Sequence, residues 1–363
     1  STQAKTLFPY TTLFRSRAIA AVALQYQPQV VVDMHEFTVG DRWLAKFGAY
    51  AKYDALLQAA TVGNMDAKMA SLALNKYVGD ARSAIEQQGL TSFWYHTSSS
   101  QAADRLVSMG GVQADTGRNV YGLRNAVSLL IETRGVGLGR AHFLRRVHTH
   151  VLAGLAIVKR AAQDGKALVS AVAKADQAAV SKACQGEIVV QAQTTAEQQR
   201  LMMVDAVSGL DRDMTVDWRS ALAIKTIQTR PRPCGYWIAA DQVMAAQTLQ
   251  LLGVRVIALP RPIVAKVERY VIASERGGQR QDARGAIAPA TSDVIGETTL
   301  QQATIRELSV STEAAKQALA AGGWYVPLNQ AMAHLAIVAL EPDSQNSFVA
   351  NRILSIHERS LLR

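Results

Sequence analysis

Cysteines and long apolar runs are what this sequence has least of. Only Cys184 and Cys234 occur in 363 residues, and neither belongs to a CxxC pair, which excludes a disulfide-rich scaffold and a cysteine-based zinc site. The two could form one bridge in an oxidising compartment or remain buried thiols, and the rarity of lone bridges in larger domains favours free thiols. No apolar run reaches the ~18–20 residues that a membrane-spanning helix needs, so we expect no membrane span.

Clustered positive charge is also missing. The 39 Lys and Arg residues outnumber the 29 Asp and Glu residues and give a net charge of +10, but they are scattered and do not alternate with aromatic residues. This pattern favours an ordinary basic surface over a nucleic-acid site. An apolar fraction of 49% and a charged fraction of 19% are typical of a globular protein, and the length suffices for two domains.

The first sixteen residues fit nothing that follows them. The string TLFPYTTLFRS, at Thr6–Ser16, is identical to the translation of a widely used sequencing adapter. We therefore expect residues 1–16 to be adapter-derived and non-native, and the true N-terminus of the protein to be missing. Without Lys5 and Arg15, 37 basic and 29 acidic residues leave a net charge of +8.

Two short apolar runs predict buried strands. Val30–Met34 (VVVDM) and Ser128–Thr133 (SLLIET) are continuous and apolar, as expected of strands covered on both faces in a mostly parallel sheet. Arg17–Gln27 predicts a helix before the first run, and Arg140–Gln163 predicts an amphipathic helix after the second. The sequence therefore predicts an α/β fold.

The remaining segments complete this prediction. Ala45–Gln88 is expected to be mainly helical, Ser92–Thr97 a strand, and Ser98–Gly122 a long loop, because turn residues occur throughout it. After a second helix, the pattern becomes strand-rich and polar from Glu187. We place a domain boundary near Gly186, with residues 17–186 forming a mixed, mostly parallel sheet flanked by helices and residues 187–363 an α+β accessory domain.

His35 follows the first predicted strand and is the first candidate for chemistry. In a strand, Asp33 and His35 point to the same face, so the carboxylate could bind one ring nitrogen and orient the other towards a metal. A histidine at a strand end is otherwise commonly a structural hydrogen-bonding group.

Glu132 is the second candidate. It follows three apolar residues, and burial is expected to raise the pKa of its carboxyl towards the range useful for a general base. Arg134 lies two residues on and could pair with it, which would be a purely structural arrangement. The preceding loop, Gly117–Asn125, contains Arg124 and Tyr121, and arginine and phenol groups suit a carboxylate-binding pocket.

Two segments together resemble a known family. QPQVVVDMHEFTVG, followed about a hundred residues later by GRNVYGLRNAVSLLIETRGVG, resembles the last metal-binding strand and the catalytic strand of carboxypeptidase A-like zinc peptidases. The resemblance covers Arg17 to about Gln163. It implies that His35 is a zinc ligand, Glu132 the general base, Arg134 the arginine of an ExR pattern and Tyr121 the substrate-binding tyrosine.

The same resemblance implies zinc-assisted hydrolysis of a peptide, with arginines holding the terminal carboxylate of the substrate. However, the family's HxxE zinc-binding pair does not occur between Arg17 and His35. Two of three zinc ligands are therefore missing, and we expect this chain to be an inactive fragment. The family also suggests a bacterial protein, periplasmic or secreted.

Two alternatives remain open. The first is a zinc-dependent N-acyl-amino-acid hydrolase of the aspartoacylase type, which uses similar chemistry. The second is a non-catalytic binding protein on a decayed peptidase fold, which predicts that the complete gene also lacks HxxE.

Overall fold

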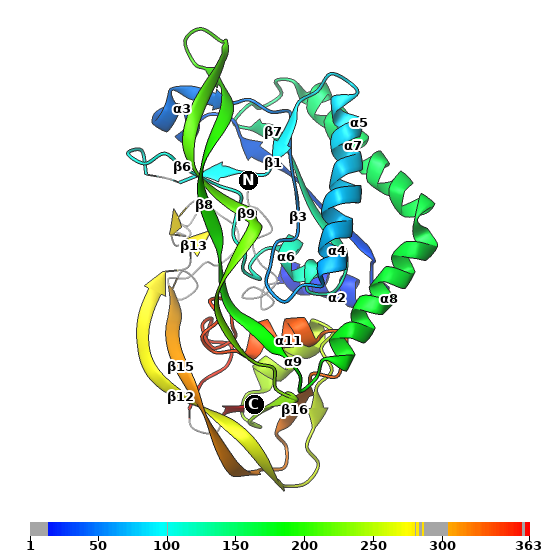
Figure 1. The fold of residues 1–363 in the computed structure, drawn as a ribbon, viewed down its shortest axis with the longest axis vertical. Helices are drawn as coiled ribbons and strands as arrows, with labels where there is room; N and C mark the ends of the chain where they lie inside the picture. The colour runs from blue at the N-terminus through cyan, green and yellow to red at the C-terminus, as the bar shows by residue number, and fades with distance from the viewer. Residues whose placement is uncertain (1–13, 100, 280, 283–284, 287–303, 358–359) are drawn as a thin grey trace.

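The computed structural model describes residues 14–99, 101–279, 281–282, 285–286, 304–357 and 360–363 (Figure 1). Residues 1–13 of the segment assigned to an adapter lie outside this set. The last three residues of that segment begin helix α2 (Phe14–Tyr26), which confirms the helix predicted from Arg17. The chain has a mixed α/β architecture.

A four-stranded sheet forms the centre of the upper half in Figure 1. Its strand order is β1-β7-β3-β4, and β1 and β4 run parallel to their neighbours whereas β3 and β7 are antiparallel. These strands are β1 (Val30–Thr38), β7 (Val127–Val136), β3 (Ala55–Ala59) and β4 (Ser92–Trp94). The two strands predicted from apolar runs are therefore confirmed. However, β1 lies at the edge of this sheet, and Met34 is 45% exposed, so the prediction that both of its faces are buried is wrong.

Helices cover one face of the sheet. Leu57, Leu129 and Ile131 of the strands share a buried apolar cluster with Tyr77 and Ile157 of the helices, and this burial holds the layers together. The helices are α4 (Ala67–Leu72), the π-helical η1 (Ala73–Val78), α5 (Gly79–Glu86), α7 (Phe143–Gln163) and α8 (Gly165–Ser181). The helices predicted around Arg140–Gln163 and after it are confirmed.

Two segments differ from the prediction. Ala45–Gln88 was expected to be mainly helical. This is confirmed for its second half, which holds α4, η1 and α5, but its first half contains the end of α3 (Arg42–Phe47) and the strands β2 (Ala49–Ala51) and β3. The sequence of β3, ALLQA, has good helix formers, and it is a strand because it pairs with β7 and β4. The expected long loop contains β5 (Thr97–Ser98), β6 (Leu106–Ser108) and α6 (Gly117–Gly122).

A long hairpin connects the two halves of the molecule. It consists of β8 (Glu187–Asp205) and β9 (Asp211–Pro231), and it extends from the lower half to the upper half in Figure 1. There β8 pairs with β2 and β9 with β6, giving a sheet of order β2-β8-β9-β6-β5. Strands that follow Gly186, β8 and β9, therefore share a sheet with strands that precede it, β2, β5 and β6. The two expected domains are joined by this sheet.

The lower half contains a six-stranded sheet of order β11-β16-β10-β17-β12-β15. Its core is shared with the upper half, because Ala20 and Ala23 of α2 belong to the same buried cluster. The elements of the lower half are β10 (Gly235–Ile238), α9 (Val243–Leu251), β11 (Ile257–Ala258), β12 (Ile263–Gln279), β15 (Thr304–Leu319), β16 (Trp324–Pro327), α11 (Ala333–Leu340) and β17 (Leu361–Leu362). The strands β13 (Gln281–Asp282) and β14 (Gly285–Ala286) form a separate two-stranded sheet. In the part of the chain that the structure describes, no helix is both long and apolar enough to cross a membrane.

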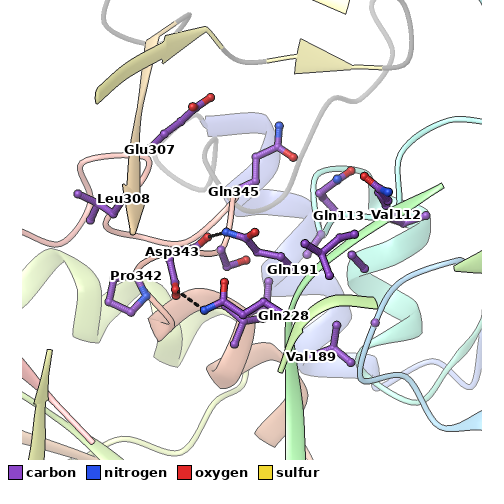
Figure 2. Close-up of a pocket in the computed structure, with 18 of the residues that line it drawn as sticks. Val112, Gln113, Val189, Gln191, Gln228, Glu307, Leu308, Pro342, Asp343 and Gln345 are labelled. Atoms are coloured by element: carbon purple, nitrogen blue, oxygen red, sulfur yellow. Dashed lines mark hydrogen bonds between the residues drawn. The ribbon is translucent and has the colours of Figure 1, made fainter. Parts of the chain in front are cut away.

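A cavity of about 620 Å³ lies where the β8–β9 hairpin meets the segment after α11 (Figure 2). Gln191 Nε2 donates to the main-chain oxygen of Asp343 at 2.8 Å, and Gln228 Nε2 donates to its carboxylate at 3.0 Å. The hairpin is therefore attached to the lower half by side-chain hydrogen bonds as well as by apolar packing.

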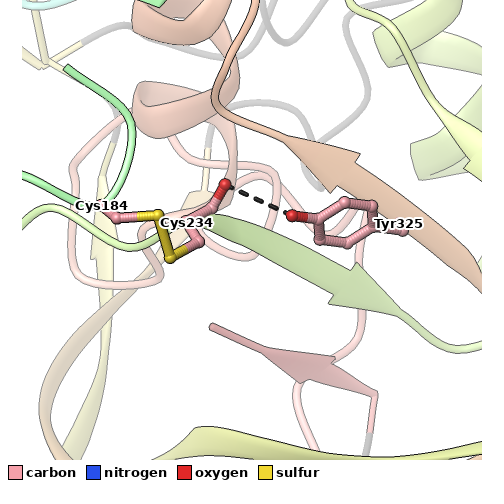
Figure 3. Close-up of a disulfide and its surroundings, with 3 residues drawn as sticks. All are labelled: Cys184, Cys234 and Tyr325. Carbon is pink, nitrogen blue, oxygen red and sulfur yellow. Dashed lines mark hydrogen bonds between the residues drawn. A yellow bond between two sulfur atoms is a disulfide. The ribbon is translucent and has the colours of Figure 1, made fainter. Parts of the chain in front are cut away.

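Cys184 and Cys234 form a disulfide (Figure 3). The main-chain N–H of Cys184 donates to the oxygen of Pro233, and the Tyr325 hydroxyl donates to the oxygen of Cys234 at 3.4 Å. The expectation of free thiols is therefore wrong. The chain passes through the whole β8–β9 hairpin between the two cysteines, and the return of β9 brings Cys234 to the end of α8.

Candidate active site

His35 and Glu132 are direct neighbours across β1 and β7. They are register partners in the parallel pair, so their side chains point to the same face of the sheet. Glu132 is 2% exposed, and the side chain of His35 is 13% exposed. The structure therefore places the imidazole and the carboxylate side by side. His35 lies three residues before the end of β1, not at its tip as the sequence suggested.

Asp33 holds the imidazole of His35 in place. Its Oδ1 lies 2.5 Å from Nε2 of His35. This hydrogen bond raises the pKa of His35, burial opposes it, and the charges of Asp33 and Glu132 raise the pKa further. Because Nε2 is bound to Asp33, Nδ1 is the nitrogen that a metal would use.

A cavity of about 180 Å³ opens beside Glu132. Aromatic rings and charged groups from several elements form its walls, and Tyr95 and His96 follow β4 directly. The lining residues are Glu36, Phe37, Thr38, Arg42, Trp43, Tyr95, His96, Thr97, Glu132 and Val136. Glu36 is neutralised by two hydrogen bonds of 2.7 Å from Arg146 of α7. Glu132 is therefore a buried carboxylate at the wall of a small pocket that is lined by both aromatic and polar side chains.

The three predicted substrate-binding residues lie in different surroundings. Tyr121 is part of α6 and is 7% exposed; burial raises the pKa of its hydroxyl, and the charge of Asp33 raises it further, so Tyr121 lies on the side of the candidate site. Arg124 donates to the main-chain oxygens of Leu252, at 2.5 Å, and Ala23, at 3.4 Å, so it joins α9 to α2. Arg134 donates to the oxygen of Lys52 and lines a separate cavity of about 320 Å³.

Arg118 is a residue of the candidate site that the sequence did not single out. It is 3% exposed, and its guanidinium carbon lies 5.6 Å from the ring centre of Tyr95, which lines the pocket. Its charge interacts with those of Asp33 and Glu132. The sequence marked the loop Gly117–Asn125 as rich in cations but could not show which arginine is buried near the charges of Asp33 and Glu132.

Because of His96, we expect the free energy of unfolding to fall strongly as the pH is lowered. Burial among aromatic rings lowers the pKa of His96 from 6.5 to about 4, and the hydrogen bond to Trp94 O opposes this only in part. The folded protein therefore binds the proton more weakly than the unfolded chain, so stability present above pH 6.5 is lost as the pH falls towards 4. The loss attributable to His96 is about 3 kcal/mol. Urea unfolding of His96→Phe at pH 7 and pH 4.5 should show a pH effect about 2–3 kcal/mol smaller than in the wild type.

The exposed His148 supplies a matched control for this measurement. His148→Gln should retain the pH effect of the wild type. If His96→Phe also retains it, the imidazole of His96 is not the titrating group. His334 is a second buried histidine whose pKa is lowered to about 4, and it contributes to the acid sensitivity that remains, together with carboxyl groups of lowered pKa such as that of Asp54.

The described residues do not form a complete metal site. Among them, no group of three or more His, Cys, Asp or Glu side chains is arranged to hold a metal ion. A catalytic zinc ion takes three protein ligands, and among the residues predicted for this role the structure contains His35 alone. The residues present therefore fit zinc in part, through one oriented imidazole beside one carboxylate.

Comparison with known proteins gives matches along most of the chain. It is 27% identical over 345 residues to Carboxypeptidase 2 of Trichophyton equinum, and 26% identical over 345 residues to that of Trichophyton tonsurans. Carboxypeptidase 2 of Trichophyton rubrum is 26% identical over 344 residues. Each match covers 94% of this chain and 60% of the relative, so the chain spans less than two thirds of these proteins' length.

No family model matches the chain, and no solved structure matches it. The three relatives are fungal, so the expectation of a bacterial source receives no support from them. The resemblance of two segments to carboxypeptidases and the similarity of most of the chain to proteins of that name agree. Together they support a carboxypeptidase-like family for this protein.

Proposed function

We propose that this chain is part of a zinc-dependent metallocarboxypeptidase that removes residues from the C-termini of peptides. The observation that carries the proposal is the register pairing of His35 with the buried Glu132 on neighbouring parallel strands. An oriented imidazole and a carboxylate on one face are the two parts of a metallopeptidase site that this sequence contains. The names of the similar proteins support the same reaction.

Each residue has a defined role in this proposal. Asp33 fixes the ring orientation and leaves Nδ1 of His35 for the metal. Glu132 accepts a proton from the attacking water and returns it to the leaving amine. Glu132 is 2% exposed, and this burial strengthens the electrostatic interactions of its carboxylate.

Zinc, when bound, would polarise the scissile carbonyl and acidify a water molecule. The described residues supply one protein ligand for it, and the sequence between Arg17 and His35 holds no HxxE pair. We therefore expect this chain alone to bind zinc weakly and to show no turnover.

A longer reading frame provides the test. We expect the genomic sequence upstream of Arg17 to encode HxxE, and the encoded protein to hydrolyse peptides in preference to N-acyl amino acids. In that protein, Glu132→Gln should lower kcat by about 10²–10⁴-fold, the range for loss of a general base, with KM and zinc content unchanged. Steady-state kinetics and metal analysis measure these quantities.

The exposed Glu197 of β8 provides a matched carboxylate control, since Glu197→Gln should retain full activity. An upstream sequence without HxxE would instead support a non-catalytic binding protein. Preferential cleavage of N-acyl amino acids would support an enzyme of the aspartoacylase type.

We further propose an extracytoplasmic location. Disulfides persist in oxidising compartments, and Cys184 and Cys234 are paired. The partners expected there are the C-termini of peptides or proteins, with no role for nucleic acid.

A further inference from the structure

The cavity of about 320 Å³ that contains Arg134 is lined mainly by cations. Among the described residues of its lining, Asp54 is the single acid, and four side chains are basic: Lys52, Arg134, Arg145 and Arg146. This cavity shares no lining residue with the pocket beside Glu132. It is therefore a second site, and the proposed peptidase reaction gives it no role.

Three of the four cations have a carboxylate partner. Arg145 donates to the two oxygens of Asp54 through Nε and Nη2, at 2.6 and 2.9 Å. Its side chain is 51% exposed, and its Nη1 has no acceptor among the residues that the structure describes. The other two pairs are Arg146 with Glu36 and Lys52 with Asp211.

Arg134 is the cation that remains without a carboxylate partner. Its Nη1 donates to the main-chain oxygen of Lys52 at 3.2 Å, and its buried Nε has no hydrogen-bond partner in the described part of the chain. Asp54 cannot supply the missing acceptor, because its oxygens already accept two hydrogen bonds from Arg145 and two from Thr91. A carboxylate offers about four acceptor positions, and these are occupied.

The positive charge of Arg134 is therefore poorly compensated. Burial lowers the pKa of Arg134, the charge of Asp54 opposes this effect, and the charge of Arg145 lowers the pKa further. Two guanidinium groups thus repel each other at the wall of one cavity. An anion in the cavity would attract both groups and would accept the hydrogen bond that Nε of Arg134 lacks.

We propose that this cavity binds a phosphate group, held by Arg134 and Arg145. Guanidinium groups match the oxygens of phosphate in geometry and form strong charge-assisted hydrogen bonds with them. The volume of about 320 Å³ is at the lower end of the range for small-molecule sites, so a phosphate ester of a few carbon atoms would fit. The inference does not depend on the proposed peptidase function.

Calorimetric titration of the full chain tests the class of ligand. The probes are inorganic phosphate, glycerol 3-phosphate and acetate, each at an ionic strength held constant with sodium chloride. Phosphate offers more oxygens and more charge than a carboxylate, so we expect at least one of the two phosphates to bind about 10-fold more tightly than acetate. The tighter of the two phosphates identifies the source of the group. Equal affinity for acetate, or no binding of either phosphate, would overturn the proposal.

Variants of Arg134 test the assignment of the residue. Arg134→Gln should weaken phosphate binding by about 10- to 100-fold, because a hydrogen bond to a charged group is lost. Arg134→Lys keeps the charge but not the planar donors, so its loss should be smaller. Arg276→Gln is the matched control, since this side chain of β12 is 81% exposed and lies outside the cavity lining, and it should bind like the wild type.

Circular dichroism establishes that each variant is folded. Wild-type affinity in Arg134→Gln would contradict the proposal, as would an equal loss in Arg276→Gln, which would indicate a general effect of surface charge. If Arg134→Gln does not fold, Arg134→Lys decides, because undiminished affinity in that variant would show that the guanidinium group does not bind the phosphate.

Discussion

Replacing Arg230 with methionine should destabilise the protein by about 3–5 kcal/mol, the usual cost of removing one partner from a buried ion pair. Arg230 donates to both oxygens of Asp343, at 3.0 and 2.8 Å, and also to Glu341. Glu341 is 0% exposed and Asp343 is 5% exposed. Without the arginine, two carboxylates would remain buried with much less compensation. Urea unfolding followed by fluorescence and circular dichroism measures the loss.

Control variants separate the loss of the Arg230 charge from a general loss of packing. Arg276 also pairs with a carboxylate, that of Glu307, but its side chain is 81% exposed, and Arg276→Met should cost at most about 1 kcal/mol. Adding Glu341→Gln and Asp343→Asn to Arg230→Met should restore part of the stability, because the buried negative charge is then gone. If Arg230→Met alone lowers the free energy of unfolding by less than about 1 kcal/mol, the buried carboxylates of Glu341 and Asp343 do not depend on Arg230 for their stability.

This ion-pair network was not predictable from the sequence, because its members come from distant parts of the chain. Arg230 is the second-last residue of β9, whereas Glu341 and Asp343 follow α11. Sequence patterns report on neighbours along the chain, and buried charge pairs form only after β9 returns to the lower half. The same reason explains why Arg124 looked like a substrate ligand, although its hydrogen bonds go to α2 and the end of α9.

The two strands of the candidate site were predictable from their own residue composition. Val30–Val32 and Leu129–Ile131 are apolar and mostly β-branched or large, and this composition alone favours buried strands. Their polar residues, His35 and Glu132, stand out against that background. That the two residues are register partners required the structure, since a shift of one residue would have put them on opposite faces.

Short strands were missed where local propensity and tertiary pairing disagree. The ALLQA segment of β3 would suit a helix, and it becomes a strand through its two neighbours in the sheet. The boundary expected near Gly186 follows a real change in pattern, from helices to long strands. What the pattern could not show is that β8 and β9 pair with β2 and β6 of the preceding segment.

Removing the disulfide should also lower the stability of the protein by several kcal/mol. The bridge between Cys184 and Cys234 closes a loop with a sequence separation of 50, which contains the entire β8–β9 hairpin. Closing a loop of this size reduces the entropy of the unfolded chain by an amount worth about 4 kcal/mol at 25 °C. We therefore expect Cys184→Ala with Cys234→Ala to lower the free energy of unfolding by about 2–4 kcal/mol.

Reduction of the wild type provides the matched comparison. A thiol reductant should lower its stability to that of the double variant and should leave the double variant unchanged, since no bridge remains there to break. Because β8 and β9 also pair with strands of the upper half, the native hairpin should stay folded in both proteins, with β8 and β9 amides protected from exchange. If the double variant matches the oxidised wild type in stability, the unfolded chain is already restricted by other means, and the bridge contributes little to this fold.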